Sequence, residues 1–417
     1  MTTQILLRSP KSPFEATSAE IALGDNLIGH NSGNLIFLET AHKILDTHDA
    51  EITPDRFAAH KMGADEINER FDVYVIPLAN AFRATFADKL GRLTKVIEGL
   101  MIPVVVLGAG LQSPIPYAAG KERPFDDTVK AFVAAVLDRS PSIGVRGEYT
   151  QDYLQRLGFR DVEVIGCPSM FLRGDQLSVT KKVPSLTPES RIAFNLSRRV
   201  TEMGPLVTSH TERYPNLRYI PQEIEALKLL LWHEDVYHSP PDSPMPTRLT
   251  HPLIRDDKAR LFLDPWPWLE YMRGFDFSFG TRIHGNIVAL LAGTPGYVLA
   301  HDTRTLELAR YFQIPHRVVT DLPPDTDAAD LYAEADYGPM LAGHAERFRT
   351  FVDYMERHGL HHIFEPGEDL TKFDRQVAAV DYPPPVRIQR RTQVRRVRYR
   401  TRRAISRVAA RVGIGAS

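Results

Sequence analysis

Short apolar runs rich in β-branched residues recur along this chain, and most are followed by a segment with helical periodicity. The apolar runs predict strands at residues 71–76, 104–107, 142–145, 162–165, 191–195, 275–279, 297–300 and 317–319. The periodic segments predict helices at residues 34–45, 127–137, 149–157, 224–232, 285–291, 304–311 and 345–358. Strands that alternate with helices favour parallel sheets covered by helices on both faces, so we predict an α/β fold.

At 417 residues the chain is too long for one ordinary core and suits two domains of roughly 150–200 residues each. Residues 173–190 contain glycine, lysine and proline without periodicity, which predicts a break between domains. Prolines 383–385 predict the end of the globular body, because proline continues neither a helix nor a central strand. We predict two Rossmann-like, doubly wound domains that face a central cleft. Their predicted bounds are residues 1–178 and 179–382, followed by a tail at 383–417.

Charge is distributed unevenly along the chain. It has 51 Lys and Arg against 52 Asp and Glu, a formal net charge of −1. From Val386 to the end there are 11 Arg and no acidic residue, which leaves 40 basic against 52 acidic side chains in residues 1–385, a net charge of −12. An acidic body argues against nucleic acid as a partner, because binding phosphates requires positive surface.

The arginines of residues 386–417 recur together with valine and isoleucine, which allows an imperfect amphipathic helix. We expect this tail to lie outside the catalytic core and to contact anionic lipid or a membrane-bound partner. Each basic residue near such a surface would contribute about 1 kcal/mol at most, so several must act together. A solvated tail without a partner is the alternative.

Several features bear on the cellular compartment. Cys167 is the single cysteine, so the chain forms no internal disulfide, as is usual in a reducing compartment. The longest apolar runs are shorter than the roughly 20 residues that a membrane span needs. The first ten residues lack the apolar stretch of a secretory signal. We expect a cytoplasmic protein, with peripheral membrane contact through the tail as a further expectation.

The most informative segment runs from residue 275 to residue 301. A predicted strand leads directly into Gly280-Thr281-Arg282-Ile283-His284, and a predicted helix follows. Ligands of open α/β sheets bind beyond the carboxyl ends of strands, and a helix N-terminus favours an anion. Arg282 and His284 therefore form a candidate anion site. The spacing also allows Arg282 to pair with an inter-domain carboxylate and His284 to cap the helix.

Three other segments hold candidate binding residues. Asn34 ends a run of small residues, 31–34, that permits close backbone approach to a ligand, unless the run is a plain capped turn. Arg146 follows the strand at 142–145 and is expected on the cleft side, unless it pairs with Glu148 or the next helix. Arg198 and Arg199 follow the strand at 191–195 and can hold a carboxylate or phosphate bidentately, unless they belong to a solvated turn.

Familiar cofactor and metal motifs are weak or missing. Gly108-Ala109-Gly110 lacks the third glycine and the acidic partner of a dinucleotide fingerprint, and neither a P-loop nor a G-x-S-x-G elbow occurs. His361-His362 lacks the spacing of a metal-binding pair on a helix. We expect neither a cofactor nor a metal, and for Cys167 we expect the role of a small buried thiol.

Taken together, these segments resemble the polysaccharide pyruvyl transferase family over residues 26–319. The most specific part is the run Gly280-Thr281-Arg282-Ile283-His284-Gly285, continued by Ala292-Gly293-Thr294-Pro295, His301-Asp302 and Glu307-Leu308. The run Val145-Arg146-Gly147-Glu148 and the later Gly166-x-Pro168-Ser169 also match. The chain departs from the family at Cys167, where an acidic residue is common, so no role is assigned to Cys167 by analogy.

The resemblance implies a fold like that of the two-Rossmann (GT-B) glycosyltransferases, with phosphoenolpyruvate as donor and a sugar of a surface polysaccharide or its lipid-linked precursor as acceptor. The product would be a pyruvate ketal. Arg282 and His284 then correspond to the family's Arg-x-His active-site pair. Substrate-binding roles are expected for the residues around that pair and in the other matching segments: Asn34, Arg146, Arg198, Arg199, Gly280, Thr281, His301 and Glu307.

Arginines suit this chemistry because they hold carboxylate and phosphate, and a histidine can give and accept protons near neutral pH. Two other functions remain open at this point. A glycosyltransferase with a nucleotide-sugar donor would use the same architecture, with Glu307 as a ribose ligand. A non-catalytic scaffold at a membrane surface would act through the basic tail.

Overall fold

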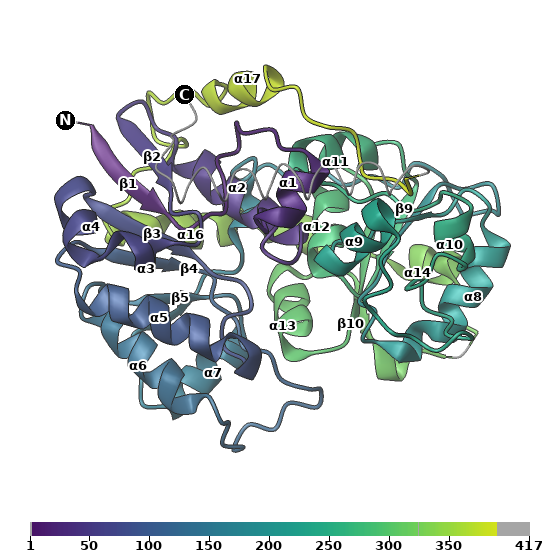
Figure 1. The fold of residues 1–417 in the computed structure, drawn as a ribbon, viewed down its shortest axis with the longest axis horizontal. Helices are drawn as coiled ribbons and strands as arrows, with labels where there is room; N and C mark the ends of the chain where they lie inside the picture. The colour runs from purple at the N-terminus through teal and green to yellow at the C-terminus, as the bar shows by residue number, and fades with distance from the viewer. Residues whose placement is uncertain (1, 324, 390–417) are drawn as a thin grey trace, which may run out of the picture.

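The computed structural model describes residues 2–323 and 325–389, and it contains two sheets of parallel strands, each flanked by helices. Figure 1 shows the first sheet with the purple and blue part of the chain and the second with the teal and green part. The predicted α/β fold with two Rossmann-like domains is therefore confirmed. None of the described helices is both long enough and apolar enough to cross a membrane.

The first sheet has the strand order β2-β1-β3-β4, and a parallel β5-β6 pair is joined to its β4 edge by a bridge between Ala109 and Val145. Its strands are β1 (Thr3–Leu7), β2 (Ala50–Pro54), β3 (Val73–Pro77), β4 (Val104–Leu107), β5 (Ile143–Val145) and β6 (Val162–Val164). Its helices are α1 (Ala19–Gly24), α2 (Gly33–Leu45), α3 (Ala59–Met62), α4 (Ala64–Arg70), α5 (Ala87–Glu98), α6 (Asp126–Leu137) and α7 (Glu148–Arg156).

Alternation along the strands divides the first domain into two apolar layers. Val73 and Val75 of β3 pack in the cluster that contains α2, whereas Tyr74 and Ile76 pack in the cluster of α5 and α6. Successive strand side chains point to opposite faces, so a strand buried on both faces reads as a continuous apolar run. This explains why β3 and β4 are recognisable in the sequence.

The second sheet has the strand order β11-β10-β9-β7-β8, and all its pairs are parallel. Its strands are β7 (Ile192–Asn195), β8 (Arg218–Tyr219), β9 (Phe277–Gly280), β10 (Gly296–Ala300) and β11 (His316–Val318). After β6, the rest of the chain contains ten α-helices in the described residues. They are α8 (Gly204–Arg213), α9 (Ile224–Trp232), α10 (Pro252–Arg255), α11 (Pro265–Met272), α12 (Ile283–Leu291), α13 (Thr303–Phe312), α14 (Ala328–Glu334), α15 (Gly338–Ala342), α16 (His344–Arg357) and α17 (Lys372–Ala378).

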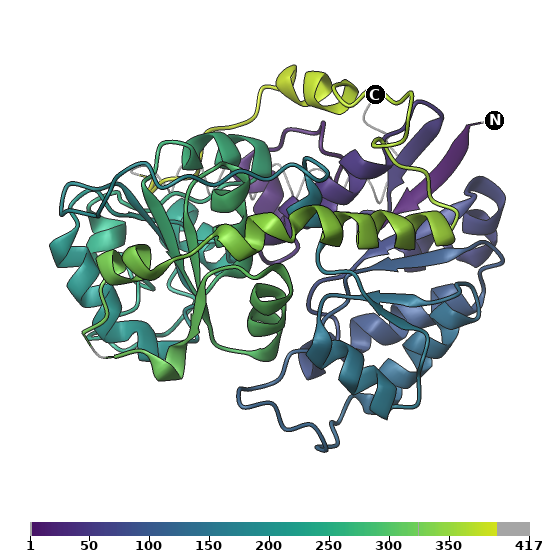
Figure 2. The same ribbon diagram turned by 180° about the vertical axis from the view of Figure 1, so that it is seen from behind.

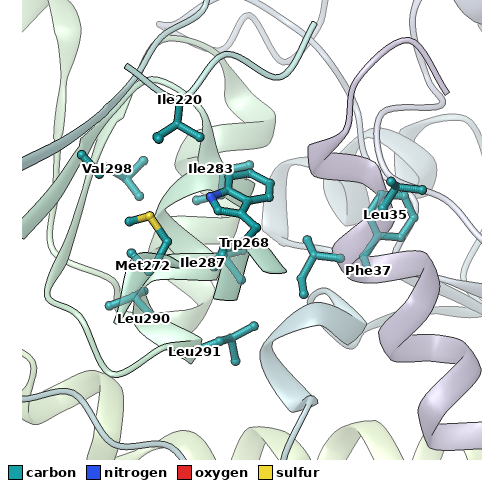
Figure 3. Close-up of a cluster of buried hydrophobic side chains, with 14 of the residues drawn as sticks. Leu35, Phe37, Ile220, Trp268, Met272, Ile283, Ile287, Leu290, Leu291 and Val298 are labelled. Atoms are coloured by element: carbon teal, nitrogen blue, oxygen red, sulfur yellow. The ribbon is translucent and has the colours of Figure 1, made fainter. Parts of the chain in front are cut away.

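The two halves meet where α2 packs against α11 and α12. Every residue of α12 is buried, and so is nearly every residue of α2, including the polar Glu39 and Lys43. Figure 3 shows Trp268 of α11 and Ile287 and Leu291 of α12 on the side that faces Leu35 and Phe37 of α2. The core is thus continuous across the junction.

The end of the chain returns to the first domain, as Figure 2 shows for the long helix α16. The Tyr354 hydroxyl donates to the carbonyl of Val106 at 2.9 Å, His358 Nε2 lies 3.1 Å from the carbonyl of Ser142, and Arg357 pairs with Glu163. Residues 354–358, which the sequence assigned to the second domain, therefore pack on the first sheet. The change from one sheet to the other occurs between β6 and β7, and the exact domain bounds remain a prediction.

All the predicted strands and helices are present, with ends that differ by at most two residues. Three strands escaped prediction: β1 begins with two polar residues, β2 is half-buried and ends in proline, and β8 has two residues. Helix α11 was missed because it begins Pro265-Trp266-Pro267, a pattern that does not resemble a helix interior. The other described helices that were not predicted are α1, α3, α4, α5, α8, α10, α14, α15 and α17.

The predicted end of the globular body is wrong by a few residues. Beyond the prolines, Val386 is buried and exchanges two backbone hydrogen bonds with Leu261, and the N–H of Gln389 donates to the carbonyl of Leu230 at 3.0 Å. Arg387 pairs with Asp257. The prolines exclude a helix at residues 383–385, but the extended segment that follows them can still form backbone hydrogen bonds with a neighbouring strand-like segment. The rest of the predicted tail, residues 390–417, lies outside the described residues.

Candidate active site

The carboxyl ends of both sheets open onto one cleft of about 750 Å³. The cleft is lined by the residues that directly follow strands β1, β5 and β10, which are Arg8, Arg146 and His301. Parallel strands end at the same edge of a sheet, so two sheets facing each other bring these ends together. Nine Arg and Lys side chains line the cleft against three carboxylates, which makes it cationic within an acidic body.

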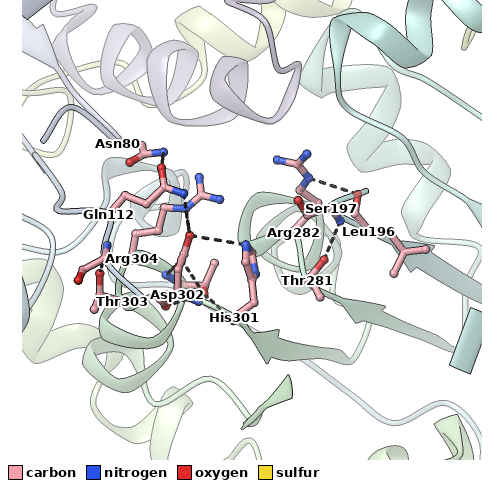
Figure 4. Close-up of polar contacts among 12 residues, drawn as sticks. Asn80, Gln112, Leu196, Ser197, Thr281, Arg282, His301, Asp302, Thr303 and Arg304 are labelled. Carbon is pink, nitrogen blue, oxygen red and sulfur yellow. Dashed lines mark hydrogen bonds and ion pairs between the residues drawn. The ribbon is translucent and has the colours of Figure 1, made fainter. Parts of the chain in front are cut away.

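A sharp turn after β9 positions Arg282 and His284. Gly280 has φ of +138°, and a Cβ there would lie 1.8 Å from the carbonyl oxygen of Asn195, so only glycine fits. The Thr281 hydroxyl accepts the backbone N–H of Ser197 at 2.7 Å, as Figure 4 shows. Gly280 serves the turn and does not line the cleft, whereas Thr281 does.

The buried side chains of two asparagines, Asn195 and Asn286, hold the same turn by hydrogen bonds. The Asn195 side chain accepts the backbone N–H of Arg282 at 3.2 Å, and it donates to the Asn286 side chain at 3.0 Å. Asn286 in turn donates to the carbonyl of Gly280 at 3.1 Å. Both amides are almost fully enclosed, so losing either partner would leave unpaired polar groups inside. These positioning residues were not predicted.

His284 lies in the first turn of α12 and is buried at the cleft floor. Its ring centroid is 5.4 Å from that of Phe37, and Nε2 is 3.8 Å from the sulfur of Cys167. Burial, and then repulsion from Arg146, Arg304 and Arg282, hold the pKa of His284 well below its usual range. The helix cap is Arg282 without a side-chain bond, so the alternative that His284 caps α12 is wrong.

Arg282 is mostly buried and forms an ion pair with Glu223, while its Nε donates to the carbonyl of Leu196 at 3.3 Å. Glu223 belongs to the same half of the chain as Arg282, directly before α9, so the alternative of an inter-domain partner is also wrong. The Nε of Arg198 lies 3.9 Å from the other oxygen of Glu223, and its guanidinium lies 4.4 Å from the ring of Tyr237.

Arg146 is almost fully buried, which is costly for a charged side chain. Its Nε donates to the carbonyl of Gly108 at 3.1 Å, and a Cβ on Gly110 would lie 2.5 Å from Arg146 Cδ. Gly110 therefore makes room for an arginine rather than a dinucleotide, whereas a Cβ on Gly108 would lie 2.7 Å from the carbonyl oxygen of Gly166. Glu148 pairs with Arg310 and not with Arg146. Among the described residues, no carboxylate lies within 4.0 Å of the Arg146 guanidinium.

After β10, the carboxylate of Asp302 contacts several polar side chains of the cleft (Figure 4). Asp302 caps α13 through the N–H of Thr305 and accepts Arg304 Nε at 2.7 Å and Gln112 Nε2 at 3.2 Å. His301 Nε2 lies 3.5 Å from the same carboxylate, yet burial lowers the pKa of His301 to about 4. Arg304 is thereby directed into the cleft beside His284.

Comparison with known families adds one finding to this geometry. The sequence model of the family described as polysaccharide pyruvyl transferase matches residues 31–303, well over half of the chain. The chain belongs to the polysaccharide pyruvyl transferase family. Every predicted site residue except Glu307 lies within the matched part.

Among solved structures, the UDP-GlcNAc 2-epimerase of Methanocaldococcus jannaschii, in complex with UDP-GlcNAc and UDP, is 11% identical, with 85% of this chain and 99% of that one covered and a TM-score of 0.43. The corresponding enzyme of Neisseria meningitidis is 12% identical (91% and 99% covered, TM-score 0.38). The glycosyltransferase SnogD of Streptomyces nogalater is 12% identical (85% and 96% covered, TM-score 0.32). Likeness at this level carries no argument about activity. Comparison with curated proteins gives no match.

In this pyruvyl transferase family member, the cleft brings together most of the predicted site residues: Asn34, Arg146, Arg198, Arg199, Thr281, Arg282, His284 and His301. One of the small residues at 31–34, the glycine, has a packing role that was not predicted. A Cβ on Gly33 would lie 2.3 Å from Gln222 Oε1 and 3.1 Å from Cβ of His284, so this glycine lets α2 approach the second domain. Asn34 itself donates to the carbonyl of Gly29 at 3.2 Å.

The placement predicted for Glu307 is wrong, because its carboxylate is enclosed and does not line the cleft. It accepts the backbone N–H of Thr150 at 3.0 Å and the Thr150 hydroxyl at 2.8 Å. Burial raises the pKa of Glu307 to about 7, although both contacts with Thr150 oppose the rise. Glu307 thus joins α13 to the start of α7 across the domains.

Sequence reasoning missed several charged residues of the cleft, among them Arg83, Lys89, Glu223 and Arg304. Arg304 could have been found, since it follows the carboxyl end of β10 at a helix start. Arg83 and Lys89 lie several residues beyond β3, in a loop and in the first turn of α5, and their approach to the cleft depends on tertiary packing. The described residues also place His48, Asp49 and Glu368 close enough to share a metal, but outside the cleft.

We expect His284 to remain neutral in the protein without ligand and to gain a proton more readily when an anion binds. Burial and three arginines disfavour the imidazolium, and a bound anion opposes both effects, by about one pKa unit or more. NMR titration of labelled histidines, assigned with a His284→Gln variant, should show no protonation of His284 near pH 6.5 and a higher apparent pKa with saturating inorganic phosphate. An ordinary titration near pH 6.5, unchanged by phosphate, would contradict this account.

Proposed function

We propose that this cleft transfers the pyruvyl group of phosphoenolpyruvate to two hydroxyls of a sugar in a surface polysaccharide or its precursor. The products are a pyruvate ketal and inorganic phosphate. The observation that carries the proposal is a histidine buried in the first turn of α12 and lining the cleft, whose pKa is held low by burial and by the charges of Arg146, Arg304 and Arg282. The donor carries a carboxylate and a phosphate, and such a site provides cations for both.

The reaction needs proton movements that a neutral imidazole can perform. One sugar hydroxyl adds to C2 of the donor and loses its proton, while C3 gains a proton and the methylene becomes a methyl group. Phosphate then leaves with its bonding electrons, and the second hydroxyl adds to C2 as its proton passes to phosphate. The lowered pKa of His284 favours an unprotonated imidazole before the donor binds, so it is available as a base. The negative charge of the bound donor then favours the imidazolium that takes up the first proton and protonates C3.

The arginines have a separate role in this scheme. As phosphate departs, negative charge grows on its oxygens, and fixed guanidinium groups in a partly dehydrated cleft stabilise that charge. The nucleotide-sugar alternative expected Glu307 to bind a ribose, and the enclosure of Glu307 against Thr150 disfavours it. Release of phosphate from phosphoenolpyruvate that depends on an added sugar, measured over a panel of acceptors, tests the proposal directly. Release of a nucleoside diphosphate from a nucleotide sugar would support the alternative.

We expect His284→Ala to lower kcat by roughly 10²–10⁴-fold while phosphoenolpyruvate still binds, because general acid/base catalysis is lost and the arginines remain. His361→Ala, at an exposed histidine outside the cleft, is the matched control and should leave kcat unchanged. Calorimetry measures donor binding and circular dichroism confirms folding. A folded His284→Ala protein with near-normal turnover would show that His284 is not the acid/base.

We expect Arg282→Ala to weaken donor binding by at least about tenfold, a loss of about 1.4 kcal/mol, and Arg282→Lys to restore it only partly, because an ammonium lacks the bidentate fork. Removing Arg282 also leaves the Glu223 carboxylate with only the longer contact to Arg198, at 3.9 Å, so its charge would repel the donor more strongly. The double variant Arg282→Ala/Glu223→Gln separates these effects. If the double variant bound phosphoenolpyruvate as tightly as the unaltered protein, Arg282 would only neutralise Glu223.

The basic tail remains a proposal for contact with anionic lipid. Because residues 386–389 are attached to the second domain, the informative truncation ends at Gln389 rather than before Val386. We expect this truncation to reduce co-sedimentation with vesicles that contain phosphatidylserine and to preserve turnover of a water-soluble acceptor. Unchanged vesicle binding would exclude the tail as the contact, and lost turnover would indicate that the tail contributes to catalysis.

A further inference from the structure

A second group of cations lines the wall of the cleft that the first domain provides. Arg83 lies 5.7 Å, Lys89 5.9 Å and Arg8 6.0 Å from the centre of the Phe86 ring, so three positive groups surround one aromatic side chain. Arg8 also lies 4.4 Å from the centre of the Phe57 ring. Arg92, one helical turn after Lys89 on α5, lines the same wall.

Among the described residues these cations form no ion pair with a carboxylate, although the charge of Arg8 opposes the rise that burial causes in the pKa of Asp55. Within residues 2–323 and 325–389, no carboxylate lies within 4.0 Å of the charged groups of Arg8, Arg83, Lys89 or Arg92, whereas Arg56 nearby pairs with Glu15. Burial, followed by repulsion from Arg8, Arg83 and Arg92, lowers the pKa of Lys89. Like charges held together without counter-charge destabilise one another, and a bound anion would offset that cost.

This group acts on a different part of the cleft from the arginines around His284, with Arg83 as the link between them. The charges that depress the pKa of His284 belong to Arg146, Arg304 and Arg282, and none of the Phe86 group contributes. Arg83 links the two ends, because burial and the charges of Arg304 and Arg199 lower its pKa to about 10. The cleft therefore presents one cationic zone at His284 and another at Phe86.

We infer that the zone formed by Arg8, Arg83, Lys89 and Arg92 around Phe86 is a second anion subsite, which binds a diphosphate group carried by the acceptor sugar. This inference rests on the proposed function, in which the His284 zone holds the donor. A neutral sugar would leave the charge of these four cations uncompensated, whereas the oxygens of a diphosphate can accept hydrogen bonds from several of them and offset their repulsion. The sugar hydroxyls would then lie between the two zones, beside His284.

Calorimetric titration of inorganic pyrophosphate into the full chain saturated with phosphoenolpyruvate tests the inference. We expect pyrophosphate to bind despite the filled donor zone, and Lys89→Gln/Arg92→Gln to weaken it by at least about tenfold while phosphoenolpyruvate binding changes less than about twofold. Lys95→Gln is the matched control, at an exposed lysine on the same helix outside the cleft. Failure of pyrophosphate to bind, or an equal loss in the control, would overturn the inference.

Two further experiments identify the source of the diphosphate and distinguish failure of the second subsite from failure of the proposed function. Uridine diphosphate and geranyl diphosphate are competed against pyrophosphate; the tighter competitor indicates a nucleotide-linked or a lipid-linked acceptor, and failure of both overturns the inference. The pyrophosphate titration is repeated without phosphoenolpyruvate. If phosphoenolpyruvate does not bind at all, the proposed function fails, but loss of pyrophosphate binding in Lys89→Gln/Arg92→Gln still supports the second subsite.

Discussion

At the junction of the two domains, α2 packs so closely on α12 that a Cβ on Gly33 would lie 3.1 Å from Cβ of His284. This contact closes the cleft floor and removes His284 from water. Burial then disfavours the imidazolium, and the surrounding arginines disfavour it further. The same packing that joins the two cores therefore sets the protonation state of the central residue and makes that state sensitive to a bound anion.

The distribution of charge follows from the same geometry. Residues 1–385 carry a net charge of −12, but nine cations and only three carboxylates line the cleft. Two of those carboxylates already have partners. Glu223 pairs with Arg282, and Asp55 accepts hydrogen bonds from the Tyr74 hydroxyl and from backbone N–H groups. A positive cleft in a negative body attracts anionic ligands and directs them to one place.

The sequence was sufficient to predict the parallel sheets and the Arg282–His284 turn, because both depend on local patterns: buried strands read as apolar runs, and ligands bind where such strands end. The sequence was insufficient to place Glu307. Its position after a strand does not show which side of α13 the side chain occupies, and the structure places it against Thr150. Arg83 and Lys89 reach the cleft only through the packing of α5, and Gly33 serves α12 rather than a ligand. Likewise, the prolines at 383–385 gave no sign that Val386 pairs with Leu261.

The central claim is that His284 and its arginines direct protonation of the donor's methylene carbon during transfer to a sugar. The most direct measurement is NMR of the product formed in D₂O from phosphoenolpyruvate and an acceptor that supports phosphate release. The account predicts a pyruvate ketal whose methyl group carries one deuterium, because C3 takes its new hydrogen from an exchangeable group. A ketal methyl without deuterium, or a glycosyl product formed from a nucleotide sugar in place of a ketal, would contradict it.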